Sequence, residues 1–413
     1  MRIGLRFLVP ALALLVASAS SGQPLRAGIL SNGDTTAVSG QVTVVDLSYP
    51  VTEDGVLTTA TVMWQAGNGA PCSQAMKIKV FRFLGDNSVD FIDERGPFDV
   101  TPGIVTVTLD PPIPVEKGDL IAASQLAAPP CGAVQLASET AGYHMVSISG
   151  DVSEEFSIGD TQASLFEEVP MIEASGQAEV YAGTVPAAGS AHSPSGTAFR
   201  TAIQLFNPGT AAIRGRLVFH PMGVSGSATD PSISYDLAPG ATAHFDDLVS
   251  AAGTTGLGSL DVLTQSSPPP LVVSRLFNDN GSGGTNGFSE PFIRPGDPTI
   301  LRSENSQFEL GDFVAPTDTA EFRVNFGIRA FRDGVTLSVF VTGPSGQQVS
   351  FVTRHYGPNV FEQLSAKAFT GIDLPAGASV TVQVTEGSAV VYMVTVDNKT
   401  DDTAMQIGDR RRP

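Results

Sequence analysis

The stretch Thr336–Val341, which reads Thr-Leu-Ser-Val-Phe-Val, decides the fold class. Its residues Leu337, Val339 and Val341 recur at every second position, and side chains two positions apart lie on one face of a β-strand. Short runs rich in Val, Ile, Thr and Phe follow along the whole chain, separated by Gly, Pro, Asn and Asp. Amphipathic helical stretches are nearly absent. Because short strands bury one face each by pairing sheet on sheet, the sequence predicts an all-β protein of tandem β-sandwiches.

The composition agrees with a turn-rich β protein. The chain has 413 residues with 43 Gly and 29 Pro, and hydrophobic residues make up 42%, which is enough for packed cores. The 42 acidic and 23 basic residues give a formal net charge of -19. Affinity for DNA or RNA comes largely from neutralising phosphates. A chain with this negative charge is therefore not expected to bind nucleic acid.

The N-terminus has the three parts of a secretory signal peptide. Arg2 and Arg6 supply positive charge, Phe7–Val16 is an apolar run of ten residues, and Ala17–Ala19 is a small-residue cleavage pattern. Cleavage near Ala19 removes both arginines and no acidic residue, so the charge becomes -21. No later segment has the length of an apolar transmembrane helix. We expect a protein that is secreted, periplasmic or at the cell surface, without membrane insertion after cleavage.

The chain contains two cysteines, Cys72 and Cys131, and both belong to the mature protein. In an exported protein an even pair of cysteines most simply forms a disulfide. Both lie in turn sequences, so the bridge is expected to join two loops of one domain. A metal site is the alternative, but two isolated cysteines without a nearby histidine make a poor zinc ligand set.

The strand pattern divides the chain into several segments. We expect the signal peptide at 1–19, a disulfide-bonded jelly-roll-like domain at 25–155, a connector at 156–182, Ig-like sandwiches at 183–297 and 305–408, and a basic tail at 409–413. Part of the connector could pair as a strand. The tail is expected to be solvated, with pairing to an acidic neighbour as the alternative.

The two C-terminal sandwiches share an ordered set of short matches. Phe199-Arg200 is matched by Phe322-Arg323 at a spacing of 123 residues, and Asp279-Asn280 by Asp397-Asn398 at a spacing of 118. Spacings that drift by a few residues are expected when loops change length. We therefore interpret these sandwiches as two related copies of one module.

Four segments within 183–295 have the character of strand and turn signatures: Phe199-Arg200-Thr201, Asn207-Pro208-Gly209, Leu237-Ala238-Pro239-Gly240 and Leu271-Val272-Val273-Ser274-Arg275. With these segments the module resembles tandem β-sandwich modules in exported proteins of environmental bacteria. The resemblance weakens over 308–408, where Arg332-Asp333-Gly334 stands in place of the Asn-Pro-Gly turn. It implies a bacterial adhesion or scaffold unit without assigned chemistry, and it concerns fold more than function.

Catalytic and metal-binding motifs are absent from the sequence. The five histidines have no close metal-ligand spacing, and neither a Gly-x-Ser-x-Gly elbow nor a Walker A loop occurs. We therefore assign no catalytic residue and expect no tightly bound cofactor.

Two weaker candidate sites remain. Trp64, the only tryptophan, could stack on a sugar ring, although a core or edge position is the more common role for such a residue. The run Asn278, Asp279 and Asn280 begins a loop with oxygen-bearing residues at positions 1, 3 and 5 and Gly at position 6, as in an EF-hand. Position 12 is Ser289 and no helices are expected beside it, so an ordinary hairpin loop is the alternative to a weak surface calcium site.

We expect an exported, non-enzymatic β-sandwich protein for surface interaction, adhesion or scaffolding, with a surface protein or a glycan as its partner. A carbohydrate-binding protein that uses the N-terminal domain is the second hypothesis. A hydrolase with dispersed catalytic residues is the third, and a Ser–His pair or a cleft with paired carboxylates would favour it.

Overall fold

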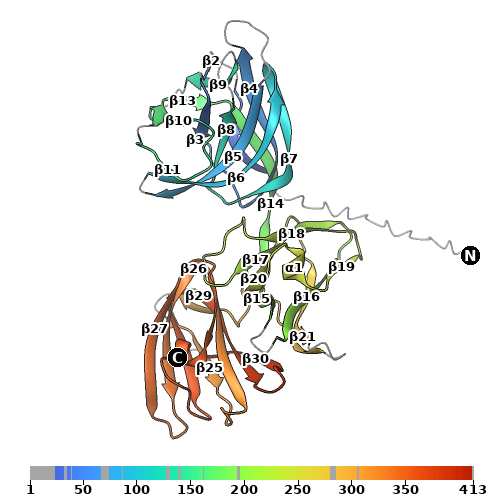
Figure 1. Ribbon diagram of the computed structural model, residues 1–413, viewed down its shortest axis with the longest axis vertical. Helices are drawn as coiled ribbons and strands as arrows, with labels where there is room; N and C mark the ends of the chain where they lie inside the picture. Colours follow the sequence, from blue (N-terminus) through green and yellow to red (C-terminus); the bar gives the residue numbers. More distant parts are fainter. Residues whose placement is uncertain are drawn as a thin grey trace, which may run out of the picture.

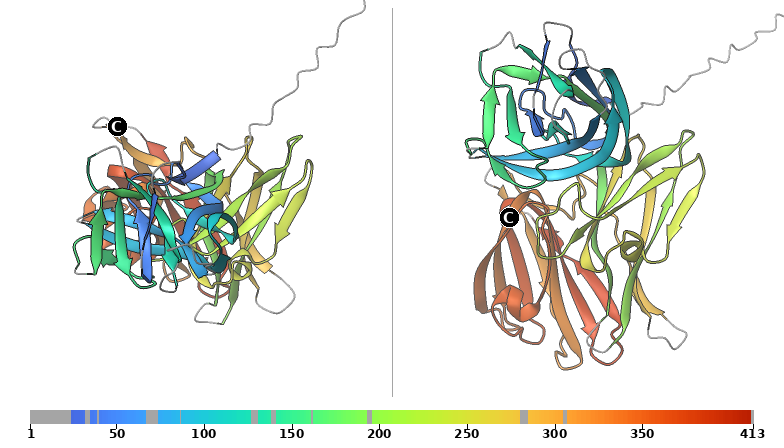
Figure 2. Two further views of the ribbon diagram at one scale, coloured as in Figure 1. Left: turned by 90° about the horizontal axis from the view of Figure 1, so that it is seen from above. Right: turned by 45° about the horizontal axis from the view of Figure 1, so that its top comes forward.

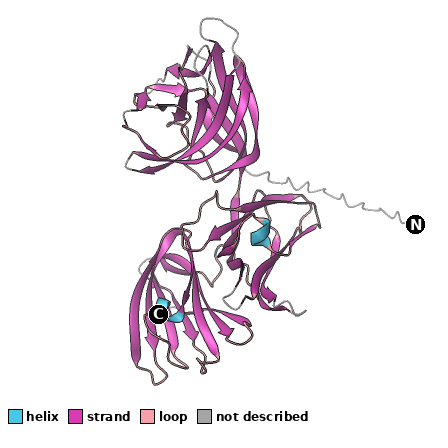
Figure 3. Ribbon diagram, viewed as in Figure 1, coloured by secondary structure: helices cyan, strands magenta, loops and turns pink. Residues whose placement is uncertain are grey.

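The computed structural model describes residues 24–31, 35–38, 40–66, 74–85, 87–126, 131–137, 141–160, 162–192, 196–279, 285–304 and 307–411. Most of these residues lie in β-strands, with two short helices among them, α1 (Leu248–Ala251) and α2 (Ala366–Thr370) (Figure 3). The prediction of an all-β sandwich fold is confirmed. The strands form four hydrogen-bonded sheets, which belong to three structural units that we name unit 1 (24–178), unit 2 (180–290) and unit 3 (301–411) (Figure 1).

Unit 1 consists of two seven-stranded antiparallel sheets. The first contains β1 (Pro24–Ile29), β2 (Thr35–Ala37), β4 (Gly55–Ala66), β7 (Gly103–Val115), β9 (Cys131–Ala137), β13 (Glu168–Pro170) and β14 (Ile172–Ala178). The second contains β3 (Val42–Asp46), β5 (Gln74–Gly85), β6 (Ser88–Val100), β8 (Leu120–Gln125), β10 (Met145–Ser149), β11 (Phe156–Ser157) and β12 (Ala163–Phe166).

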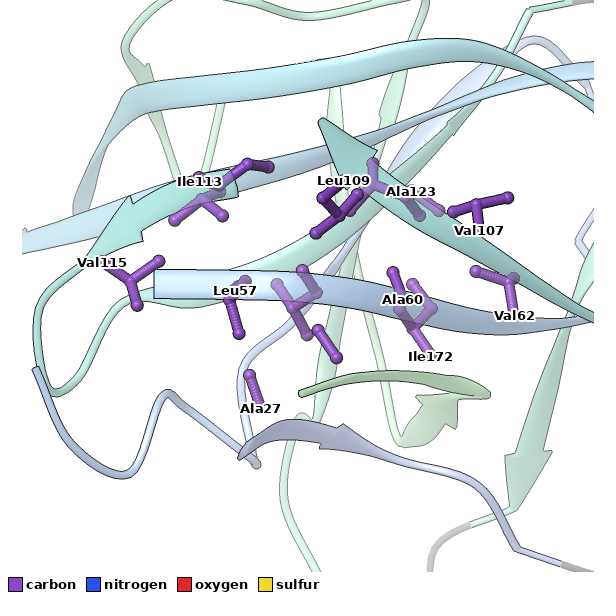
Figure 4. Packing of buried hydrophobic residues seen from close by; sticks show 14 of the residues in the cluster. Ala27, Leu57, Ala60, Val62, Val107, Leu109, Ile113, Val115, Ala123 and Ile172 are labelled. Carbon is purple, nitrogen blue, oxygen red and sulfur yellow. The ribbon is translucent and has the colours of Figure 1, made fainter. Parts of the chain in front are cut away.

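The two sheets of unit 1 face each other across a hydrophobic core. Leu57 and Ile113 enter it from the first sheet and Ala123 enters it from the second (Figure 4). The right-hand view of Figure 2 looks into this unit and shows its strands curving around the interior. Alternation places Leu25 and Ala27 of β1, and Met76, Ile78 and Val80 of β5, in this core, as the period of two predicts.

The segment 156–182 is not a connector, because it supplies four strands of unit 1 and the start of unit 2. β11 and β12 are edge strands of the second sheet, and Phe156 packs edge-on against Phe81 at 5.6 Å between ring centroids. β14 lies between β1 and β4 in the first sheet. A single residue, Glu179, separates β14 from β15 (Val180–His192), so the real connection between units 1 and 2 is very short.

Units 2 and 3 each form one continuous hydrogen-bonded sheet. Unit 2 contains β15, β16 (Ala198–Phe206), β17 (Ile213–Pro221), β18 (Ser232–Leu237), β19 (Thr242–Phe245), β20 (Gly256–Thr264), β21 (Leu271–Asp279) and β22 (Thr285–Glu290). Unit 3 contains β23 (Leu301–Glu304), β24 (Gln307–Phe308), β25 (Leu310–Val314), β26 (Phe322–Thr342), β27 (Gln348–Tyr356), β28 (Phe361–Ser365), β29 (Ser379–Asp397), β30 (Thr403–Ile407) and β31 (Asp409–Arg411).

Each of these two sheets is folded over into two layers. In unit 2, β15 pairs with β20 over most of its length and with β16 only at Ser190–His192. Leu217 and Val262 from one layer therefore meet Ile203 from the other in a single core. In unit 3, the long strands β26 and β29 pass through both layers, with a register break between Ala330 and Val335.

Units 2 and 3 have the same pattern of strand pairing. In unit 2, β16 lies between β19 and β21, and β17 lies between β18 and β20. In unit 3, the first half of β26 lies between β28 and the second half of β29, and its second half lies between β27 and the first half of β29. The expected matches are offset by one residue, because Ala198 faces Asp279 whereas Phe322 faces Asp397, and the interpretation as two copies stays a prediction.

Units 2 and 3 lie side by side, and unit 1 sits at one end of both (Figure 1). The strand β29 explains this contact, because it is apolar on both faces. Val391 and Met393 point into the core of unit 3, whereas Tyr392 and Val394 form a second cluster together with Ala187 of unit 2. A continuous apolar run of this kind is typical of a strand that is buried on both sides.

The chain end also differs from the expected solvated tail. β31 pairs with β25, and Arg411 binds Asp312 with 2.9 Å between Nε and Oδ2, while Arg410 binds Glu309. The alternative of pairing with acidic neighbours therefore describes residues 409–411, and the last two residues lie outside the described part of the chain.

Trp64 lies in the core of unit 1 with 1% of its surface exposed, so it is not a sugar-stacking platform.

We predict that Trp64→Ala lowers the free energy of unfolding of unit 1 by about 3–5 kcal/mol, because it removes a large buried side chain and leaves a cavity. Urea unfolding followed by circular dichroism measures the effect, since the only tryptophan is lost. Phe351→Ala, at a position that is 52% exposed, is the matched control and is expected to change stability by no more than about 0.5 kcal/mol. Equal effects of the two substitutions would show that Trp64 is not a core residue.

Candidate functional site: a charged junction of the three units

The short connection between units 1 and 2 carries the first buried ion pair. Glu179, the single residue between β14 and β15, binds Arg216 of β17, with its Oε2 2.9 Å from Nε and 2.8 Å from Nη2. The two side chains are 1% and 6% exposed, respectively. Arg216 also donates to the carbonyl oxygen of Ala228 at 3.0 Å. A two-pronged Arg–carboxylate contact of this kind fixes direction as well as distance.

A histidine held between two carboxylates lies on the same face of unit 2. Because β17 alternates, Arg216 and His220 point outward, whereas Leu217 and Phe219 point into the core. The Nδ1 atom of His220 lies 2.6 Å from Oδ2 of Asp230, and its Nε2 atom lies 3.1 Å from Oδ2 of Asp261. Both ring nitrogens therefore act as donors, as they do in the charged imidazolium.

The electrostatics of the junction favour this charged form. Burial by itself would lower the pKa of His220, but the carboxylates of Asp261 and Asp230 outweigh it and raise the pKa above its ordinary value. Burial would likewise raise the pKa of Asp261, yet Arg329 and His220 lower it to about 2. The same contacts thus favour the protonated form of His220 and the ionised form of Asp261.

Unit 3 contributes Arg329, which follows Asp230, His220 and Asp261 in a series of contacting charged side chains. Arg329 of β26 has no exposed side-chain surface, and its Nη2 atom lies 2.7 Å from Oδ2 of Asp261. Its neighbours Ile328 and Ala330 point into the core of unit 3, so strand alternation aims Arg329 at unit 2. Asp261 is therefore shared by His220 of its own unit and Arg329 of the next.

Unit 1 reaches the junction through two further contacts. Asp54, just before β4, binds Arg332 of unit 3, with 2.9 Å between Oδ2 and Nη1. Glu116, just after β7, binds Arg82 at 3.1 Å and also accepts the backbone N–H of Ala228 of unit 2 at 3.1 Å.

The loop that connects β17 to β18 touches both other units. Besides the contact of Ala228 with Glu116, the N–H of Gly223 donates to the carbonyl oxygen of Phe361 in unit 3 at 2.9 Å. Gly226 lies directly over the ring of His220, where a Cβ atom would come within 2.5 Å of Nδ1. A residue without a side chain is therefore required for the loop to cover the histidine.

These residues surround a cavity of about 270 Å³, whose walls include Val115, Val218, Leu263 and Phe331 between the charged groups. Three carboxylates (Glu179, Asp230 and Asp261) and three cations (Arg216, His220 and Arg329) balance one another. Neither nitrogen of His220 is available to take a proton from a substrate, because each faces a carboxylate. The arrangement acts as a clamp between units.

The structure describes the side chain of only one residue of the expected calcium site, Asn278. Asn278 is 1% exposed, and its side-chain amide donates to the carbonyl oxygen of Asp401 in unit 3 at 2.8 Å. Its Oδ1 atom accepts the N–H of Asn286 at 3.2 Å. Asp279 is the last residue of β21, and Asn280 lies outside the described residues. Asn278 thus has a structural role, whereas calcium binding to the rest of the loop stays a prediction.

The expected disulfide falls largely outside the described residues, because Cys72 lies in the segment 67–73. Cys131 begins β9 and faces Ala66, the last residue of β4, in the first sheet of unit 1. The pairing of Cys72 with Cys131 stays a prediction. Among the described residues there is no group of three or more His, Cys, Asp or Glu side chains arranged to hold a metal ion.

A Ser–His contact does occur, in unit 1. The Oγ atom of Ser48 lies 2.6 Å from Nδ1 of His144. Nearby Asp46 is buried, and burial raises its pKa to about 6, although its hydrogen bonds to the N–H groups of Ser48 and Tyr49 act in the opposite direction. These bonds close the turn after β3, so the group has an evident structural role.

The sequence offered one signal for the junction, which the motif search missed. Arg216, His220, Asp261 and Arg329 each interrupt an apolar strand at a position that points away from the core of its own unit. A charge within an otherwise apolar strand needs a partner. The sequence alone did not show which distant strand would supply it.

Comparison of the chain with protein-family models, with curated proteins and with solved structures finds no match. The resemblance to exported bacterial sandwich modules therefore stays a hypothesis. In the part of the chain that the structure describes, no helix is long and apolar enough to span a membrane.

We predict that Arg329→Met lowers the free energy of unfolding by about 3–5 kcal/mol, because it leaves a buried carboxylate without one of its partners. Arg214→Met removes an arginine from a pair with Asp236 in which both side chains are more than half exposed, and it is expected to cost at most about 1 kcal/mol. Urea unfolding of the two variants provides the comparison. Similar losses in both would contradict the role of Arg329 as a buried clamp.

We predict that His220 makes stability depend on pH. Since its folded-state pKa is raised, its contribution is complete below the unfolded value of about 6.5 and is lost as the pH rises through the folded-state pKa. Urea midpoints measured between pH 5.5 and pH 9 should fall with pH more steeply for the wild type than for His220→Gln. His244→Gln, at a side chain that is 45% exposed, is the matched control and should keep the wild-type slope. Parallel slopes for the wild type and His220→Gln would show that His220 is not the titrating group.

Proposed function

We propose that the protein is an exported, non-catalytic scaffold that presents loops and sheet faces in a fixed geometry for surface interaction or adhesion. The junction described above is the observation that carries the proposal. Buried charges from unit 2 and unit 3, with contacts to unit 1 at the rim, hold the three units in one relative orientation. A fixed orientation is what a presenting scaffold needs, and His220 lacks the free nitrogen that a catalytic base needs.

An apolar patch on unit 2 is the candidate contact surface. Leu271 of β21 and Phe206 of β16 are direct partners across the sheet, and they are 47% and 38% exposed. Val273, two residues further along the same face, is 60% exposed, whereas Val272 between them packs against the core. Clustered exposed apolar side chains mark sites of interaction with other molecules more often than isolated ones do.

The two other hypotheses differ in what supports them. Carbohydrate binding through Trp64 loses its supporting observation, since that side chain is buried. Hydrolysis keeps one, the contact between Ser48 and His144, and is the second candidate function.

We predict that beads coated with the mature protein bind whole bacterial cells or immobilised glycans through the apolar patch. Changing Phe206, Leu271 and Val273 to Ser should lower the fraction of beads that stays bound to the cells or glycans about tenfold. This is the effect expected when a contact surface loses its central side chains. Changing Val349 and Phe351 of unit 3 to Ser is the matched control, because these positions are 38% and 52% exposed and lie outside the patch.

Two outcomes would count against the proposal. Beads that are not retained, or whose retention is the same for all three proteins, would rule out this surface. Labelling of Ser48 by a fluorophosphonate probe, with loss of labelling in His144→Gln, would favour the hydrolase instead.

A further inference from the structure

A second cavity lies within the interface of units 2 and 3, away from the charged junction. Its volume is about 300 Å³. Ala187, Ala191 and Leu257 line it from unit 2, and Phe361, Val394 and Met405 line it from unit 3. The walls are therefore predominantly apolar and come from two different units.

On the side of unit 2, the strand β15 lines this space with small side chains, which leave it unfilled. Ala187, Ala188 and Ala191 all contribute to the cavity from this strand. Protein interiors normally pack with few voids larger than a water molecule, so an unfilled apolar space of this size is unusual. An engineered apolar cavity of about 150 Å³ in another protein binds benzene, so this one has room for a hydrocarbon group about twice as large.

Two basic side chains, Arg323 and His192, line the cavity together with the polar side chains of Asn325, Gln363 and Thr403. Arg323, near the start of β26, lines the cavity, and its side chain is 41% exposed. Its guanidinium binds Asp401 at 2.6 Å and Asn398 at 3.2 Å. Since a guanidinium has five N–H donors, these two contacts leave capacity for a further acceptor. His192, at the end of β15, is exposed and lines the same cavity from unit 2.

We propose that this cavity binds an amphiphilic carboxylate, with a hydrocarbon chain of roughly ten carbon atoms between units 2 and 3 and the carboxylate beside Arg323 and His192. The chain fills the apolar space, and the two basic side chains receive the negative end. This proposal is independent of the adhesion proposed above, because the cavity and the apolar patch share no residue.

Titration calorimetry with decanoate and with 1-decanol, both below the concentration at which they aggregate, tests the proposal on the mature protein. Wild-type protein should bind both, and decanoate more tightly. Ala191→Phe fills the space from unit 2, and Met405→Phe fills it from unit 3, so each should weaken binding of both probes at least about tenfold. Val273→Phe, which adds the same ring at a 60% exposed position outside the cavity, is the matched control and should bind as the wild type does.

The head-group assignment has its own variant. Arg323→Gln should remove most of the preference for decanoate over 1-decanol while leaving the binding of 1-decanol unchanged. Circular dichroism and the melting temperature show whether each variant is folded, and only folded variants are compared. Failure of the wild type to bind either probe, or unchanged affinity in both cavity-filling variants, would overturn the proposal. Equal affinity of the wild type for the two probes would overturn the assignment of a carboxylate.

Discussion

The contact between Arg329 and Asp261 is the interaction on which the arrangement of units 2 and 3 depends. Taking either charge out of water is costly, and the cost is offset only when partner and geometry are both right. Asp261 meets this condition through Arg329 of unit 3 and His220 of its own unit. A displaced unit 3 would leave a buried carboxylate and a buried guanidinium without partners. The contact therefore selects one relative placement, whatever its net contribution to stability.

The rest of the interface is organised around this constraint. At the opposite end, Asp401 accepts from Arg323 of its own unit and from the side chains of Thr197 and Asn278 of unit 2. Between the two polar ends lie Tyr392 and its apolar neighbours. Gly327 is part of this packing, because a Cβ atom there would come within 1.8 Å of the ring of Tyr392.

The buried carboxyl group of Glu290 in unit 2 differs from that of Asp261 in its surroundings. Glu290, at the end of β22, is 5% exposed, and neither of its carboxyl oxygens has a hydrogen-bond partner of ordinary geometry among the described residues. Burial raises its pKa well above the ordinary value, while the backbone N–H of Ala187 acts in the opposite direction. A protonated carboxyl is the form that such an environment tolerates. Asp261 differs in that Arg329 and His220 lower its pKa against the effect of burial.

The sequence by itself determined the all-β class, because alternation in stretches such as Thr336–Val341 is a local property of the chain. Its interpretation of units 2 and 3 as two copies of one module stays a prediction. The sequence misplaced 156–182, since β11 pairs with β6 and β14 pairs with β1 and β4, which all lie far away in sequence, and it left open the role of Trp64. Only the tertiary structure decided that Glu179, His220, Asp261 and Arg329 meet at one junction. The physical reason is that a strand pattern shows which face a charge occupies, whereas the partner that neutralises it comes from another sheet or another unit.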